Sequence, residues 1–274
     1  MTIPMQAVGD LLLQAGRDII MPRFRRLRAE DIVEKTSHRD LVTIADEEAE
    51  AFLTPRLEAL MPGSRAVGEE AVGRDPALLA LLGQPGLHWL IDPIDGTASF
   101  AVGCALFGSM VALVQDGDAI ASWLLDPPTG RLYMARKGEG AWLREPDGEM
   151  QRLTMPRPSS LAHLSGVANY GISDRTLAMR MAQRIDRTAG VLNMRCSGQE
   201  YPAMALGQIH WAIYGRGIPW DHAPGTLLIS EAGGVARRLN GQLYRACDPP
   251  GGSPLLVACG EEQWDWLKTG LFDP

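Results

Sequence analysis

Three short segments of the chain place carboxylates beside apolar residues at the ends of expected helices and strands. They are Gly68-Glu69-Glu70, Asp92-Pro93-Ile94-Asp95 and Trp220-Asp221. A buried carboxylate must be hydrogen-bonded, paired with a cation or bound to a metal. Few lysines or arginines accompany these acids, and oxygen ligands favour a hard divalent cation such as Mg²⁺. The three segments together therefore indicate a magnesium site.

Each segment taken alone has a simpler interpretation. Asp-Pro-x-Asp-Gly, which begins at Asp92, is good turn chemistry because proline fixes φ and glycine tolerates positive φ. The Glu-Glu pair at Glu69 fits a solvated acidic pair, and Asp221 fits the N-cap of the helix that follows it. Asp46 fits the third helical position of a capping box that begins at Thr43. These alternatives stay open for each segment, and only their joint occurrence favours a metal.

The first half of the chain is expected to hold two helices and a meander of strands. Apolar residues at helical spacing predict a helix over Val8 to Ile19, which Pro22 kinks or ends. A second helix is expected from Thr43 to Met61. Strands are expected at Leu87–Ile91, Met110–Val114, Ala119–Leu125, Arg131–Ala135 and Ala141–Leu143. Asp116-Gly117 is a hairpin signal between the second and third of these strands.

The second half alternates between strands and helices. Strands are expected at Leu164–Ala168, Val191–Arg195, Ile209–Tyr214, Val235–Leu239 and Leu255–Ala258. Helices are expected at Asp174–Ile185, just before Gly207, at Asp221–Ala232 and at Glu261–Lys268. Asp147-Gly148 and the prolines that follow form the best boundary. A meander of strands followed by alternating strands and helices predicts a layered α/β or α+β fold. One lobe is expected over residues 1–150 and the other over 151–274.

Length and composition exclude several classes of protein. The 274 residues, 46% of them apolar, suggest about two domains or one large domain with two lobes. The 26 Lys and Arg against 33 Asp and Glu give a net charge of −7, which argues against nucleic acid as a partner. The four cysteines form no C-x-x-C pair, so we expect reduced thiols in a cytoplasmic protein.

One uncharged stretch, residues 96–115, is long enough to span a bilayer. It contains three glycines and several polar residues, and acidic residues flank it on both sides. A spanning helix is more uniformly apolar and has Lys or Arg on its cytoplasmic flank. We therefore expect a turn and a buried strand here, and no membrane partner.

Several motifs resemble those of one enzyme family, in the same order along the chain. They are Lys35 with Asp40-Leu41-Val42-Thr43-Ile44-Ala45-Asp46, Gly68-Glu69-Glu70, WLIDPIDGTASF from Trp89, the Y-x-A-x-x-G-x-G-A pattern from Tyr133, and WDHAPG from Trp220 followed by EAGG from Glu231. The chain resembles the inositol monophosphatase family of Mg²⁺-dependent, Li⁺-sensitive phosphatases, relatives of fructose-1,6-bisphosphatase. The WLIDPIDGT segment is highly specific to that family, and the other motifs are moderately specific.

The resemblance implies a role for each matching residue. Glu69, Asp92 and the backbone carbonyl of Ile94 would hold one Mg²⁺. Asp92, Asp95 and Asp221 would hold a second, and Glu69 would help to hold a third.

The resemblance also implies how the phosphate and the water are held. Thr97, supported by Asp46, would orient the attacking water, and the backbone N–H groups of Gly96 and Thr97 would bind the phosphate. Glu69, Thr97 and Asp46 are thus the expected catalytic residues. His222 falls at a variable position of the second signature, where we expect packing and not a catalytic base.

The fold implied is a layered α-β-α-β-α sandwich with the metals between its two lobes. The activity implied is hydrolysis of a small phosphorylated polyol, sugar or related metabolite, in a protein that resembles homodimeric enzymes. One alternative is a 3′-phosphonucleotide phosphatase. Another is a catalytically silent metal- or phosphate-binding protein on the same fold, which would lack one of the expected acids.

The residues expected near the substrate depart from the family pattern. Inositol monophosphatases have a Glu seven positions before the second-signature Asp, and this chain has Tyr214 there. A phenol offers a donor and an aromatic face in place of a carboxylate. Glu200 lies in the segment that faces the substrate in that family, and we expect it to take over recognition of hydroxyls, or else to decorate a short helix. Pro224 replaces the usual Ala and is expected in the first turn of its helix, where it is tolerated.

Overall fold

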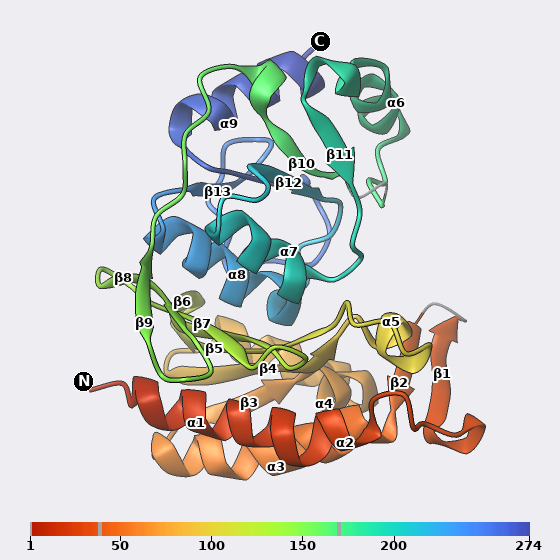
Figure 1. Cartoon of the computed structure of the whole chain (residues 1–274), viewed down its shortest axis with the longest axis vertical. Helices are drawn as coiled ribbons and strands as arrows, with labels where there is room; N and C mark the ends of the chain where they lie inside the picture. Colours follow the sequence, from red (N-terminus) through yellow and green to blue (C-terminus); the bar gives the residue numbers. More distant parts are fainter. Residues whose placement is uncertain (1, 38–39, 169–170) are drawn as a thin grey trace.

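The computed structural model describes residues 2–37, 40–168 and 171–274. These residues form a two-stranded, a five-stranded and a seven-stranded sheet. Figure 1 shows the two larger sheets stacked with helices below, between and above them. The layered α-β-α-β-α sandwich expected from the sequence is therefore confirmed.

The seven-stranded sheet has its strands in sequence order, from β3 to β9. Its strands are β3 (Arg65–Gly68), β4 (Leu87–Asp95), β5 (Gly108–Gln115), β6 (Asp118–Asp126), β7 (Arg131–Arg136), β8 (Gly140–Arg144) and β9 (Met150–Leu153). Only β3 and β4 pair in parallel; every later pair is antiparallel, as in a meander. The expected division of the chain at residue 150 falls at the first residue of β9.

Helices and a short hairpin precede and flank this sheet. They are α1 (Met5–Ala15), α2 (Met21–Arg23), α3 (Ile44–Leu60), α4 (Glu69–Arg74), α5 (Thr97–Ala101), β1 (Ile32–Ser37) and β2 (Asp40–Thr43). α1 and α3 cover the outer face of the sheet (Figure 1). A π-helical turn at Gly16–Ile20 joins α1 to α2, and the helix ends one residue after Pro22, as the sequence indicates.

The five-stranded sheet has the order β11-β10-β12-β14-β13. Its strands are β10 (Ser165–Ala168), β11 (Gly190–Leu192), β12 (Trp211–Tyr214), β13 (Val235–Arg238) and β14 (Leu255–Ala258). The helices of this half are α6 (Arg175–Arg184), α7 (Ser197–Ala205), α8 (Pro219–Glu231) and α9 (Glu261–Leu267). Figure 1 shows α7 and α8 between the two sheets, with α6 and α9 on the far side of the smaller one.

Apolar residues of the central strands are buried on both faces of the larger sheet. Met110 and Leu124 pack into the core shared with α7 and α8, whereas their neighbours Val111 and Trp123 pack against α1 and α3. This alternation follows from the two-residue period of a strand. The sheet is therefore a common wall of two hydrophobic cores.

Three elements differ from the sequence expectations. β4 continues four residues beyond Ile91 and includes the Asp-Pro-Ile-Asp segment. The strand expected at Val191–Arg195 covers Gly190–Leu192, and Arg195, three residues beyond it, adopts a left-handed conformation with φ of 54°. α8 begins at Pro219, so Pro224 is the sixth helical residue and not part of the first turn.

The hairpin at Asp116-Gly117 is confirmed, with φ of 52° and 87° as a type I′ turn requires.

All four cysteines are free thiols. In the described ranges, which include 96–115 in full, no helix has the length and apolar character needed to cross a membrane. Residues 96–115 form a left-handed glycine, the short helix α5, a loop and the buried strand β5, in agreement with the expectation.

Candidate active site

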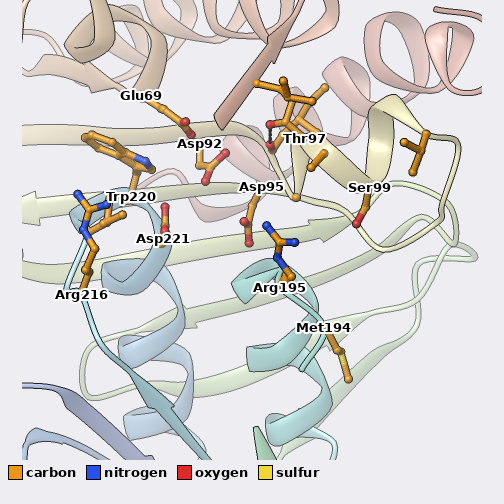
Figure 2. Close-up of a pocket in the computed structure, with 16 residues that line it drawn as sticks. Glu69, Asp92, Asp95, Thr97, Ser99, Met194, Arg195, Arg216, Trp220 and Asp221 are labelled. Carbon is orange, nitrogen blue, oxygen red and sulfur yellow. Dashed lines mark hydrogen bonds between the residues drawn. The ribbon is translucent and has the colours of Figure 1, made fainter. Parts of the chain in front are cut away.

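Four carboxylates from three segments of the chain line one cleft of about 670 Å³. Glu69 begins α4, Asp92 and Asp95 lie near the end of β4, and Asp221 lies in the first turn of α8. Figure 2 shows Glu69, Asp92 and Asp221 grouped around the cleft, with Asp95 beside them. The fold therefore brings together the three acidic segments that the sequence singled out.

A bulge in β4 places both of its aspartates in the cleft. Asp92 pairs with Met110 of β5 and Asp95 pairs with Gly108, so three steps along β4 match two along β5. In a regular strand, residues three apart point to opposite faces of the sheet. The extra residue reverses this relation, and both carboxylates line the same cavity.

Asp92 is the most constrained acid of the cleft. Its side chain is 1% exposed and its Oδ1 has no hydrogen-bond partner. Burial raises the pKa of Asp92 well above its usual value, and the carboxylates of Glu69 and Asp95 raise it further. An ionised carboxylate in this position needs a cation nearby.

The start of α7 holds Asp95 in place. Asp95 Oδ2 accepts hydrogen bonds from Ser197 Oγ at 2.7 Å and from the backbone N–H of Gly198. Gly198 allows this approach, because a Cβ atom there would lie 3.2 Å from the Cα of Gly108 on β5. Burial raises the pKa of Asp95, and these donors counteract the rise. No local pattern in the sequence pointed to these two donors.

Lys35 is the cation paired with the acidic segment at the start of α4. Its Nζ lies 3.0 Å from Glu69 Oε1 and 2.7 Å from Glu70 Oε1. Burial alone lowers the pKa of Lys35, but the two carboxylates outweigh it and raise the pKa above the usual value. The pair at Glu69 and Glu70 is thus not the solvated pair of the simpler interpretation, since Glu70 is only 5% exposed.

Asp46 makes both of the contacts that the sequence suggested. Its Oδ2 accepts from the backbone N–H of Thr43 at 2.8 Å and from the Thr43 hydroxyl, which forms the capping box of α3. Its Oδ1 lies 3.2 Å from Thr97 Oγ1. Thr97 Oγ1 also lies 2.8 Å from the carbonyl oxygen of Ile94. Burial raises the pKa of Asp46 to about 7.

Gly96 joins β4 to α5 in a left-handed conformation with φ of 85°. A Cβ atom at this position would lie 2.7 Å from the carbonyl oxygen of Leu106. Both constraints require glycine. Gly96, Thr97 and Ile94 all line the cleft beside the four acids.

The donor set of the cleft fits a hard divalent cation in chemistry. The donors are carboxylate and carbonyl oxygens, and the unpartnered Oδ1 of Asp92 lies among them. Within the described part of the chain, however, no three His, Cys, Asp or Glu side chains are grouped as a ready-made metal cage. Two of the acids instead accept bonds from Lys35, Ser197 and Gly198.

A second cavity of about 580 Å³ adjoins the first. Asp95 and Asp221 line both cavities, and Glu200 and Tyr214 line only the second. Glu200 is 3% exposed and accepts from the Met194 N–H at 3.2 Å. Burial, with Asp95, raises the pKa of Glu200 to about 7. Glu200 is therefore buried at the cavity wall and does not decorate the surface of its helix.

The second cavity also contains aromatic residues. Tyr214 is 3% exposed, and its hydroxyl lies next to the carboxylate of Glu200. The ring of His222 lies 4.4 Å from that of Tyr214, and its Nδ1 lies 3.1 Å from the hydroxyl of Tyr201. Burial lowers the pKa of His222 to about 3, so the imidazole is neutral. His222 is a packing residue, as the sequence indicates.

Comparison with known proteins places the chain in a family. The model of the inositol monophosphatase family matches residues 5–269. An inositol-1-monophosphatase of Mycobacterium leprae is 32% identical over 240 residues, which are 86% of this chain and 80% of that protein. A fructose-1,6-bisphosphatase/inositol-1-monophosphatase of Thermotoga maritima is 25% identical over 215 residues, 78% of each protein.

The fold agrees with this placement. The extragenic suppressor protein suhB of Bartonella henselae has a crystal structure that superposes with a TM-score of 0.79, at 20% identity and 97% coverage of both chains. The chain belongs to the inositol monophosphatase family. It is an enzyme of the phosphoric monoester hydrolase class. The alternative of a catalytically silent binding protein is therefore set aside.

Proposed function

We propose that this enzyme hydrolyses a small phosphorylated polyol, sugar or related metabolite, with Mg²⁺ as its cofactor. The observation that carries the proposal is the convergence of Glu69, Asp92, Asp95 and Asp221 on one cleft. The unpartnered Oδ1 of buried Asp92 supports a cation there, since the Lys35 amine and the Ser197 hydroxyl bond to other acids of the cleft.

Two or three Mg²⁺ ions would be held by the residues that match the family motifs. Glu69, Asp92 and the Ile94 carbonyl would hold one, and Asp92, Asp95 and Asp221 another. When bound, such ions supply positive charge to the phosphoryl oxygens and lower the pKa of a coordinated water. The ion pair of Lys35 with Glu69, and the bonds of Ser197 and Gly198 to Asp95, hold these carboxylates in position.

The chain's other residues position the reactants. Thr97 Oγ1 donates its single proton to Asp46 or to the Ile94 carbonyl, so its lone pairs remain to orient a water. The backbone N–H groups of Gly96 and Thr97 are proposed to bind the phosphate. The water oxygen bonds to phosphorus as the P–O bond to the alcohol breaks. The leaving oxygen takes a proton, and the products are an alcohol and inorganic phosphate.

The second cavity supports the proposal that Glu200 and Tyr214 contact the alcohol part of the substrate. Both residues line it and both are buried with polar groups at its wall. The free thiols support a cytoplasmic location, which we propose together with a homodimer on the family resemblance.

Phosphate release from a panel of phosphomonoesters tests the proposal. We expect turnover with Mg²⁺ and none with a chelator, and restored turnover when Mg²⁺ is added back. Equal rates in chelator and in Mg²⁺ would contradict the cofactor. No release from any polyol phosphate, sugar phosphate or phosphonucleotide would contradict the substrate class.

A further inference from the structure

Two arginines stand at the junction of the two cavities. Arg195 precedes α7 and Arg216 follows β12, and both line the first and the second cavity. Figure 2 shows the guanidinium of Arg195 beside Asp95 and that of Arg216 beside Trp220 and Asp221. The junction is therefore the most basic part of a cleft that is otherwise acidic.

Neither guanidinium forms a hydrogen bond or ion pair with the described residues. Most other arginines near an acid do so, as Arg144 does with Asp10 at 2.7 Å and Arg131 with Glu145 at 3.0 Å. Burial raises the pKa of Asp221 well above its usual value, and the positive charge of Arg216 opposes part of this rise without a direct bond to that carboxylate. The donors of both arginines thus remain available to a ligand.

The backbone of Arg195 adopts a left-handed conformation that residues with a side chain disfavour. Its φ of 54° is unusual for a residue with a side chain, and the Asn193 side chain stabilises the turn by accepting the Arg195 N–H at 2.9 Å. Glycine is the usual residue in this conformation. The turn follows β11, and the Arg195 side chain extends into the cleft beside Asp95 (Figure 2).

The same cavity offers further polar groups to a ligand. The hydroxyl of Tyr214 is buried at its wall, next to the carboxylate of Glu200. This hydroxyl and the two arginines together suit a ligand that carries both a hydroxyl and an anionic group. Arg216 is two residues beyond Tyr214, so one short segment supplies both groups to the cavity.

We propose that the substrate carries a second anionic group on its alcohol part, and that Arg195 and Arg216 bind this group while the alcohol part fills the second cavity. The substrate class is thus a phosphomonoester whose alcohol bears a carboxylate or a further phosphate. Arginine binds both groups through paired N–H donors. This inference rests on the proposed function and narrows its substrate.

An alternative role for the arginines is to bind the phosphate that is hydrolysed. This alternative makes a different prediction, because every substrate then depends on the arginines to the same extent. A second-anion site instead affects only those substrates that carry the additional charge. Matched substrate pairs therefore separate the two roles.

The experiment measures kcat/KM of the full-length enzyme with Mg²⁺ on two such pairs. Glycerol 3-phosphate and 3-phosphoglycerate differ by a carboxylate, and adenosine 3′-monophosphate and adenosine 3′,5′-bisphosphate differ by a phosphate. The variants are Arg216→Gln, Arg216→Lys and Arg195→Gln. Arg175→Gln is the matched control, because Arg175 is exposed on α6 and lines neither cavity.

We expect the wild type to prefer the doubly anionic member of at least one pair by about tenfold or more, the effect of one charge-assisted hydrogen bond. The pair that shows this preference identifies the anion as carboxylate or phosphate. Arg216→Gln and Arg195→Gln should remove most of the preference, Arg216→Lys should retain part of it, and Arg175→Gln should leave it unchanged.

Two results would overturn the inference and leave the proposed function intact. One is a wild type that hydrolyses both members of each pair equally well. The other is a loss in the Gln variants that is the same for both members, which would assign the arginines to the transferred phosphate. Absence of turnover on every pair, with or without Mg²⁺, would instead contradict the proposed function and this inference with it.

Discussion

Replacement of Asp92 by Asn should change the stability of the protein in opposite directions with and without Mg²⁺. In chelator the variant should be more stable than the wild type. The pKa of Asp92 is raised on folding, so its ionised form weakens the fold once the pH exceeds the unfolded value of 3.8. Asn removes that charge and keeps the shape of the side chain. It also supplies an N–H donor next to neighbouring carboxylates.

The size of each effect follows from the geometry. Relieving the desolvation of an unpartnered buried group is worth about 1–3 kcal/mol, and a kilocalorie shifts Tm by roughly 2–4 °C in a protein of this size. Because Asn removes the buried charge, the variant should gain about 2–12 °C in chelator. Mg²⁺ at a hundred times its Kd should stabilise the wild type by about 2.7 kcal/mol per site, and this gain should vanish in the variant.

Thermal melts in chelator and in saturating Mg²⁺, paired with phosphate release, measure these effects. Asp265→Asn is a suitable control, because Asp265 is an exposed residue of α9 outside the cleft. A variant that melts below the wild type in chelator would refute the account of like-charge repulsion at Asp92. A folded variant that keeps its Mg²⁺ response and its activity would refute the assignment of Asp92 as the shared metal ligand.

Three further predictions concern pH, lithium and backbone strain. The pKa of Glu200 rises from 4.5 to about 7 on folding, so stability in chelator should fall by up to ~3 kcal/mol as the pH rises through this range. Urea titrations between pH 4.5 and 7 should show a smaller loss of stability for Glu200→Gln than for the wild type, and an equal loss would contradict the role of burial. The same variant should change in substrate selectivity more than in Mg²⁺ affinity. Li⁺ is close to Mg²⁺ in size but carries half its charge, so roughly millimolar Li⁺ should inhibit turnover, and rates that are insensitive to Li⁺ at both low and saturating Mg²⁺ would count against the metal assignment. Arg195→Gly should raise Tm by roughly 2–4 °C, because glycine removes about 1 kcal/mol of left-handed strain, while the preference for a doubly anionic substrate is lost. A lower Tm would show that the Arg195 side chain stabilises the turn.

The sequence predicted those parts of the fold that depend on local patterns. The short apolar strands of the meander, the hairpin at Asp116-Gly117 and the capping box at Thr43 all appear where expected. The acidic segments were recognised because their residue types are unusual beside apolar neighbours. The order of the elements predicted a layered α/β or α+β fold, whereas the α-β-α-β-α stacking came from the family resemblance, since periodicity does not give the order of the layers.

Contacts between distant segments could not be predicted in this way. Ser197 and Gly198 bond to Asp95 from more than a hundred residues away, and the segment that contains them has no motif of its own. The bulge in β4 depends on its register with β5, which the sequence of β4 alone does not specify. The left-handed turn at Arg195 was missed because its residue type does not favour that conformation.

The position of α8 between the two sheets limits how this enzyme can move. Leu228 and Ile229 of α8 pack in the same core as Leu124 of the larger sheet and Val257 of the smaller one. A hinge that separated the sheets would pull this core apart, and close-packed interiors resist such displacement. Asp221 on this helix is therefore held in a fixed relation to Asp92 and Asp95 throughout turnover. Substrate enters and product leaves through the existing opening of the cleft, and movements that open or close it are confined to the residues around that opening.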